Sequence, residues 1–194
     1  MTRRTGRVAI TLAIALPVAG LTGTAAAAPH DDLRAAKAAT ARFHDVEHAL
    51  AAGYLRGSGC EEIPGVGAMG FHYVNPALMA DPALDPTRPE VLLYAPKANG
   101  ELRLAGVEYL KVDADQSVAT DDDRPSLFGR PFDGPMPGHV PGMPVHYELH
   151  VWLWQANPNG LFASWNPRVT CTPPAQPGHD DGSGDHGHQR RHAD

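Results

Sequence analysis

The chain has 194 residues, 42% of them hydrophobic, with 16 basic and 22 acidic residues and a formal net charge of −6 at pH 7. This acidic balance argues against nucleic acid or an anionic membrane surface as a partner, because both attract basic proteins. The length and apolar content suffice for one hydrophobic core, so we expect a single domain.

Residues 1–27 have the pattern of a cleaved secretory signal peptide. Three arginines, Arg3, Arg4 and Arg7, precede an apolar stretch over 8–21, and small alanines follow it. The stretch is shorter than the roughly 20 residues that a membrane span needs, and no second hydrophobic span follows. We therefore expect a secreted, extracellular protein whose mature chain carries 13 basic and 22 acidic residues.

The segment 31–55 predicts one amphipathic helix. Its apolar side chains recur every three or four residues, which places them on one face: Ala39, Phe43, Val46, Leu50 and Tyr54. The helix also carries His44 and His48, an i,i+4 pair with the spacing of metal ligands. Both lie away from the apolar face, so we expect them to be solvated.

The rest of the domain predicts strands joined by loops. We expect strands over 69–74, 91–94, 102–112, 146–155 and 161–165. Asn99-Gly100 indicates a hairpin turn. Residues 121–144, dense in proline and glycine, predict a long arm beside the central strand 146–155. The fold class is therefore α+β, with an N-terminal amphipathic helix packed on an antiparallel β-sheet. A small cupin-like β-barrel is the alternative.

Cys60 and Cys171 are the two cysteines of the chain. An exported protein meets an oxidising environment, so we expect a disulfide between them, from the end of the first helix to the end of the last strand. A redox or metal-thiolate pair is the alternative, which the absence of a CxxC spacing disfavours. Glu61 and Glu62 follow Cys60 in what we expect to be a solvated turn.

The segment 172–194 contains proline, glycine, aspartate and histidine with almost no apolar side chains. Such a composition buries too little surface to fold, so we expect a disordered tail after a domain over 28–171. Four tail histidines can chelate metal loosely: His179, His186, His188 and His192.

The strand around residue 150 is the most informative part of the chain. Alternation places Val145, Tyr147, Leu149, Val151 and Leu153 on one face, and the other face receives the side chains able to do chemistry: His146, Glu148, His150, Trp152 and Trp154. Two indoles on a polar face need cover, so we expect this face to form a site rather than a solvated surface.

Metal binding is the chemistry that this face favours. Residues two apart on a strand lie about 6.5–7 Å apart, so His146 and His150, at roughly 13 Å, are too far apart to share an ion. His72 lies on another strand, and Glu108 interrupts the otherwise apolar row of Leu102, Leu104, Gly106, Leu110 and Val112. We expect a site for one divalent transition metal, Zn, Mn, Fe or Cu, with imidazole and carboxylate ligands drawn from His72, Glu108, His146, Glu148 and His150. Either the pair His146 and Glu148 or the pair Glu148 and His150 would bind the ion, and His72 or Glu108 on a neighbouring strand would complete the site. A buried hydrogen-bonded network that fixes the arm is the alternative.

A second pattern overlaps the first. Met136, His139, Met143 and His146 occur in a loop-like stretch, and thioether with imidazole suits Cu(I). Methionine is also an ordinary filler under loops. The sequence gives no support for nucleophilic catalysis, since it has no GxSxG motif. It also has no glycine-rich phosphate-binding loop between a strand and a helix.

Three segments together resemble a group of exported bacterial proteins of unassigned function. They are 48–54, the run GAMGFHYVNP over 67–76, and 146–167, which begins HYELHVWLW. The resemblance covers roughly residues 40–171. It implies that the tail lies outside the shared domain, and it implies no catalytic residue or cofactor.

We therefore expect a secreted small-ligand or metal-binding protein. A metal-dependent hydrolase or oxygenase with Glu108 or Glu148 as base is one alternative, and a structural envelope protein without a site is another. The sequence leaves the oligomeric state open.

Overall fold

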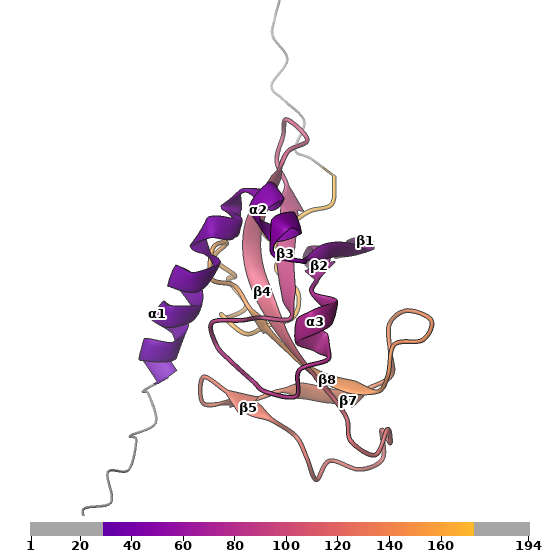
Figure 1. Cartoon of the computed structure of the whole chain (residues 1–194). Coiled ribbons are helices and arrows are strands. Elements are labelled where there is room, and N and C mark those ends of the chain that lie inside the picture. Colours follow the sequence, from indigo (N-terminus) through magenta and orange to yellow (C-terminus); the bar gives the residue numbers. More distant parts are fainter. Residues whose placement is uncertain (1–28, 173–194) are drawn as a thin grey trace, which may run out of the picture.

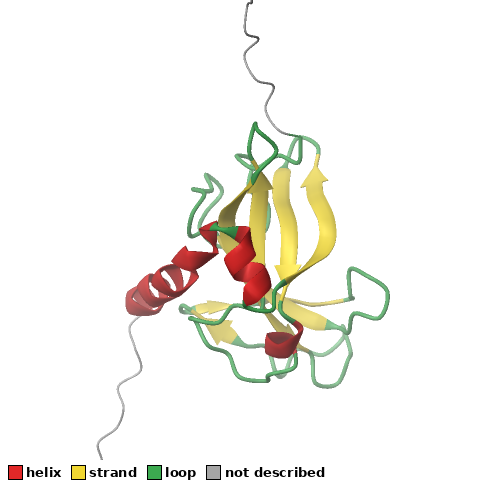
Figure 2. Cartoon of the chain, turned by 45° about the horizontal axis from the view of Figure 1, so that its top comes forward, coloured by secondary structure: helices red, strands yellow, loops and turns green. Residues whose placement is uncertain are grey.

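A computed structural model describes residues 29–172 of the chain as a mixed structure of helices and antiparallel strands (Figure 1). The predicted signal peptide and the predicted tail from residue 173 onwards lie outside the described residues. The helical segments gather beside the sheet, and the loops concentrate at its ends (Figure 2).

A six-stranded sheet forms the body of the molecule, with strand order β1-β2-β3-β4-β8-β7 and every described pair antiparallel. Its strands are β1 (Leu55–Ile63), β2 (Gly67–Val74), β3 (Val91–Pro96), β4 (Leu102–Val112), β7 (Asp133–Met136) and β8 (His146–Val151). The sheet curls into a half-barrel whose edge strands β1 and β7 are not paired with each other within residues 29–172. The mixed class is thus confirmed, whereas the closed cupin-like barrel is not formed.

The predicted helix over 31–55 is broken into three segments: α1 (Pro29–Thr40), the 3₁₀ turn η1 (Ala41–His44) and α2 (Val46–Ala51). The break is at Asp45, whose backbone is extended and whose side chain accepts a hydrogen bond from the amide of Glu47 as the cap of α2. A polar residue that caps a new helix therefore overrides the continuous apolar period. The Tyr94 hydroxyl donates to the carbonyl of Phe43 at 2.6 Å, which joins η1 to β3.

Two strand predictions were wrong. Residues 55–63 form the edge strand β1, although glycines and acids there predicted a turn. Residues 161–165 form no strand. Both the amide and the indole Nε1 of Trp152 donate to this segment, to the carbonyls of Leu161 and Ala163, and an isolated bridge between Ala68 and Asn166 follows it. The remaining strands were confirmed, although β8 ends at Val151 rather than at residue 155. Asn75-Pro76 ends β2 and begins the short helix α3 (Pro76–Met79).

The predicted arm contains three short strands. Ser126–Leu127 (β5) and Arg130–Pro131 (β6) pair with each other, whereas β7 joins the main sheet beside β8. Strand β8 is therefore second from the edge rather than central.

The two faces of the sheet carry different cores. Tyr94, Val107, Tyr109, Tyr147 and Leu149 belong to the larger core, which also includes side chains of the helical segments. The opposite face carries a smaller apolar cluster that includes Val91, Leu93, Ala95, Ala105 and Trp152.

A β-bulge in β4 changes which side chains share a face. Leu93 of β3 pairs with Gly106, but its neighbour Tyr94 pairs with Leu104, so Ala105 is an extra residue. Leu104 therefore joins the larger core, and the prediction that it shares a face with Glu108 was wrong.

Trp154 is the other residue on an unexpected face. It follows the end of β8, packs against the larger core, and donates through Nε1 to the Thr40 hydroxyl at 3.4 Å. Its predicted neighbour Trp152 does lie on the face of His146, Glu148 and His150.

The predicted disulfide is present, with the Cα atoms of Cys60 and Cys171 5.6 Å apart and a sequence separation of 111. It joins β1, rather than the end of a helix, to the segment after the Asn166 bridge. Within residues 29–172, no helix is long and apolar enough to cross a membrane.

Candidate metal centre

Strand register brings the predicted ligands onto one face of the sheet. Glu108 of β4 pairs directly with His150 of β8 and, on its other side, with Val91 of β3. Val91 pairs with Val74 of β2, and His72 lies two residues before Val74 on the same face. A diagonal row across four strands therefore connects His72, Glu108 and His150.

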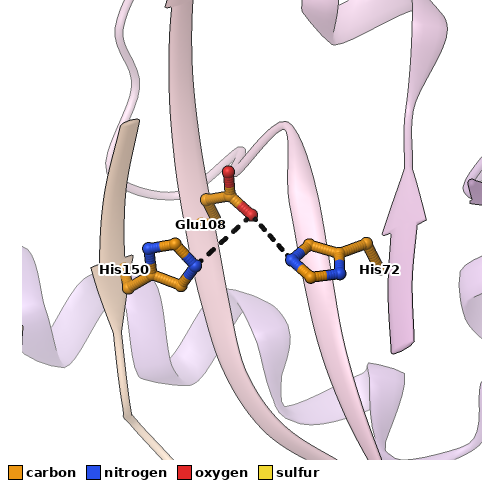
Figure 3. Close-up of side chains that lie close together, drawn as sticks. All are labelled: His72, Glu108 and His150. Atoms are coloured by element: carbon orange, nitrogen blue, oxygen red, sulfur yellow. Dashed lines mark ion pairs between the residues drawn. The ribbon is translucent and has the colours of Figure 1, made fainter. Parts of the chain in front are cut away.

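These three residues form what we call the His72 group. Oε2 of Glu108 lies 3.4 Å from Nε2 of His72 and 3.8 Å from Nε2 of His150, so the carboxylate stands between two imidazoles (Figure 3). One ligand atom from each residue lies within 4.8 Å of the others. The side chains of His72, Glu108 and His150 are 13%, 4% and 1% exposed. This is a buried cluster of two imidazoles and one carboxylate.

The outer nitrogens of both rings face oxygen atoms. Nδ1 of His72 lies 3.3 Å from the Ser58 hydroxyl, which itself donates to the Gly59 carbonyl and is thus free to accept. Oε1 of Glu61 is 3.6 Å from the same nitrogen. Nδ1 of His150 lies 3.7 Å from Oε1 of Glu148. Protons on the two Nδ1 atoms leave both Nε2 lone pairs directed at Glu108.

The other predicted ligands form a second cluster, the His139 group, which contains His139, His146 and Glu148. Nε2 of His146 lies 3.7 Å from Oε2 of Glu148, and the rings of His139 and His146 are 5.0 Å apart. His146 and His150 thus belong to different groups, as the strand spacing predicts. The five candidate ligands of the predicted single site are thus divided between two adjacent groups, and His139 joins the second.

Four buried side-chain atoms in these groups have no hydrogen-bond partner within the described part of the chain: Oε2 of Glu108, Nε2 of His146, and Nδ1 and Nε2 of His150. Native proteins rarely bury polar atoms without partners, because each costs about 1–3 kcal/mol. A hydrogen-bonded brace for the arm would satisfy these atoms, so the geometry disfavours that alternative.

Burial governs the protonation of the His72 group. It lowers the pKa of His72 and lowers that of His150 to about 4, so both rings are neutral near pH 7. Burial, and then repulsion by Glu148, raises the pKa of Glu108 well above its ordinary value. Burial alone would raise the pKa of Glu148 as well, but the neighbouring rings of His146 and His150 lower it overall.

A cavity of about 190 Å³ opens beside the His72 group. His72, Glu108 and Glu148 lie in its wall together with apolar side chains from four elements and the loop after β7: Met69, Val74, Met79, Val91, Leu110, Val140 and Met143. No lysine or arginine is among the lining residues, so the cavity favours a neutral or cationic small ligand over an anion.

The remaining candidates have other environments. Within the predicted copper loop, Met143 accepts a hydrogen bond at its sulfur from the His139 amide, and Met136 pairs with His146 across β7 and β8. On the helical segments, His44 packs against Trp154 while Nδ1 of His48 contacts the Arg42 carbonyl. These two do not form a described metal-ligand group.

Sequence reasoning missed the part played by β1. Ser58 and Glu61 face His72, and Glu62 accepts a hydrogen bond from the Cys171 amide at 2.8 Å. The available signal was that Ser58, Glu61 and Glu62 all lie within two residues of Cys60, because a disulfide fixes the segment that carries it.

No protein-family model, no curated protein and no solved structure matches this chain.

Proposed function

We propose that this protein binds a divalent first-row transition metal ion through Nε2 of His72, Nε2 of His150 and the carboxylate of Glu108. The observation that carries the proposal is that three acceptor atoms converge within 4.8 Å, and the two from Glu108 and His150 are buried without a hydrogen-bond partner in the described residues.

A cation resolves the electrostatic conflict in this group. Without one, two imidazole lone pairs face the buried Glu108 carboxyl, which must either take up a proton or bear the cost of several kcal/mol of an uncompensated buried charge. A metal ion accepts all three lone pairs at once. The same low-dielectric surroundings then strengthen its attraction to Glu108.

The donor set suits Zn, Mn, Fe or Cu. Two imidazoles and one carboxylate form catalytic zinc sites as well as the three-ligand sites of non-haem iron. Ser58 and Glu61 at His72, and Glu148 at His150, would orient the two rings as outer partners, an arrangement usual for metal-bound histidines.

A metal-dependent hydrolase or oxygenase is the second candidate. The observation in its favour is the cavity, because three protein ligands leave coordination positions for water and substrate, and Glu108 and His72 lie in the cavity wall. Glu148, which lies in the same wall without belonging to the His72 group, is then the candidate general base. The apolar lining favours a small, largely neutral substrate.

We further propose that the protein acts outside the cytoplasm and belongs with the exported bacterial proteins that it resembles. The arginine-then-apolar pattern of residues 1–27 supports export. The disulfide between Cys60 and Cys171 supports an oxidising compartment. A structural envelope protein without a site is disfavoured by the unsatisfied ligand atoms.

The test is metal stoichiometry in a full-length chain whose four tail histidines are replaced by alanine, because the tail would otherwise bind metal by itself. Chelator-stripped protein is titrated with Zn²⁺, and bound metal is measured by elemental analysis and by the rise in Tm. His72→Ala and Glu108→Gln are compared with His48→Ala and Glu47→Gln, which remove the same groups from exposed positions.

We expect His72→Ala and Glu108→Gln each to lose one equivalent of tightly bound Zn²⁺, while both controls keep it. Equal Zn²⁺ content in His72→Ala and His48→Ala would overturn the proposal. Because a buried substitution can unfold the domain, each variant must first show the wild-type circular dichroism spectrum without metal. Half-buried His72 is the more tolerant position.

A further inference from the structure

We infer a second metal site beside the first, in which His139, His146 and Glu148 bind a divalent transition metal ion. The inference rests on the proposed function only in that the second ion would share a centre with the first. Its ligands are a separate set of residues.

The hydrogen-bond partner of His146 fixes which of its ring nitrogens carries the proton. Its Nδ1 lies 3.0 Å from the carbonyl oxygen of Pro144, which can only accept, so Nδ1 carries the proton. In the neutral ring Nε2 therefore carries a lone pair, and this nitrogen lies 3.7 Å from Oε2 of Glu148. His146 is fully buried and this nitrogen has no partner in the described residues. Two acceptors that face each other in a buried site need a cation between them.

The third ligand comes from the loop after β7. The His139 amide donates to the sulfur of Met143 at 3.4 Å, which closes the loop beside the cavity. The His139 ring thereby stands 5.0 Å from that of His146, and one of its nitrogens lies within 4.8 Å of the other two ligand atoms. His139 is exposed, so the second ion would be reached from solvent.

Glu148 connects the two groups. Its Oε2 faces His146, and its Oε1 faces Nδ1 of His150, which is a ligand candidate of the His72 group. One carboxylate thus contacts a histidine of each site. Two ions so placed would polarise a substrate and lower the pKa of a bound water together, as in two-metal hydrolases. As a ligand of the second ion, Glu148 is no longer available as the general base, so this arrangement narrows the enzyme alternative to hydrolysis in which the metal ions activate the water.

Protonation of His146 is the competing explanation, because an imidazolium would also satisfy Glu148. That explanation leaves His139 without a role, whereas a metal requires it. Substitution of His139 therefore separates the two explanations. Because His139 is exposed, we expect the variant to fold, and its circular dichroism spectrum checks this.

The experiment titrates the full-length, tail-substituted chain with Zn²⁺ and repeats it for His139→Ala, His72→Ala and the control His48→Ala. Bound metal is counted by elemental analysis after desalting. The same samples are loaded with Co²⁺, whose visible spectrum reports the ligand set of each ion. We expect two equivalents of Zn²⁺ in the parent and in His48→Ala, and one equivalent in His139→Ala and in His72→Ala. The Co²⁺ spectra of His139→Ala and His72→Ala should differ from each other, because each variant keeps a different ligand set.

Each other outcome overturns a specific statement. One equivalent that survives in His139→Ala and disappears in His72→Ala overturns the second site and leaves the proposed function intact. One equivalent that disappears in His139→Ala and survives in His72→Ala overturns the proposed function and supports the site inferred here. No bound metal in the parent overturns both.

Discussion

Nε2 of His72 lies 3.4 Å from Oε2 of Glu108, although β3 runs between the two strands that carry them. The contact is diagonal across the sheet, so it depends on the register of two strand pairs at once. Changes to either residue or to the intervening backbone should therefore affect metal binding and stability in distinguishable ways.

Glu108→Gln should have opposite effects on stability with and without metal. Burial raises the pKa of Glu108, so the metal-free fold bears the cost of either protonating or burying this carboxylate. In chelator at pH 7.5, we expect the variant to gain about 1–3 kcal/mol in the free energy of unfolding. In saturating Zn²⁺ the wild type should be the more stable protein. Urea unfolding under both conditions tests this, and a variant less stable in both would contradict it.

Glu90 should make stability fall as pH rises. Burial raises its pKa from 4.5 to about 7, and the Leu110 amide donates to its Oε2 at 3.2 Å. Between pH 4.5 and 7 the folded protein holds a proton that the unfolded chain has lost, so stability declines across this window by roughly 3 kcal/mol at most. Glu90→Gln keeps the acceptor and removes the titration. Its unfolding free energy, measured in chelator from pH 5 to pH 8, should fall less than that of the wild type, and parallel curves would refute the assignment.

Removal of the disulfide should lower stability strongly. Cys60 and Cys171 close a loop of 111 residues, and constraint of the unfolded chain by such a loop contributes about 4–5 kcal/mol in the chain-entropy model. We expect the Cys60→Ser/Cys171→Ser double variant to lose most of this in urea unfolding. The Zn²⁺ affinity of this variant should fall too, because β1 carries Ser58 and Glu61, which face the His72 ring. Unchanged affinity in the folded variant would show that β1 is held without the bridge.

Gly70→Ala should be far more harmful than Gly65→Ala. Both glycines have a positive φ, +91° and +78°, so alanine is strained at either position. A Cβ at Gly70 would lie 2.3 Å from the Tyr94 carbonyl oxygen, whereas at Gly65 it would meet open space. We expect Gly65→Ala to cost about 1 kcal/mol and Gly70→Ala at least about 2 kcal/mol more. Thermal unfolding of the two variants side by side is the measurement, and equal costs would contradict the packing at β3.

Strand alternation in 146–151 was enough to predict the chemical face of the sheet. It placed His146, Glu148 and His150 together, and the 3.3 Å rise per residue correctly separated the two histidines. Glu108 was also recognisable, because a carboxylate on an otherwise apolar strand face is rarely buried without a functional or structural partner.

The rest depended on contacts that alternation does not encode. Strand β1 has a glycine-containing sequence of low strand propensity, and its pairing with β2 and the Cys60 disulfide stabilise it instead. The approach of His139 to His146 depends on how a proline-rich loop closes. The bulge at Ala105 gives no sequence signal, because alanine is compatible with either face.

That one extra residue lets β4 serve two purposes along its length. Before Ala105, the strand directs Leu104 into the larger core; after it, Val107 and Tyr109 continue that core while Glu108 takes the opposite side. Deletion of Ala105 would remove the bulge and make Leu104 and Gly106 neighbours, as their partners Tyr94 and Leu93 are on β3. Regular alternation would then keep Leu104 in the larger core and Glu108 on the opposite face. The loss would be the Ala105 carbonyl, which accepts hydrogen bonds from the amides of Trp154 and Gln155 and so fixes the chain after β8.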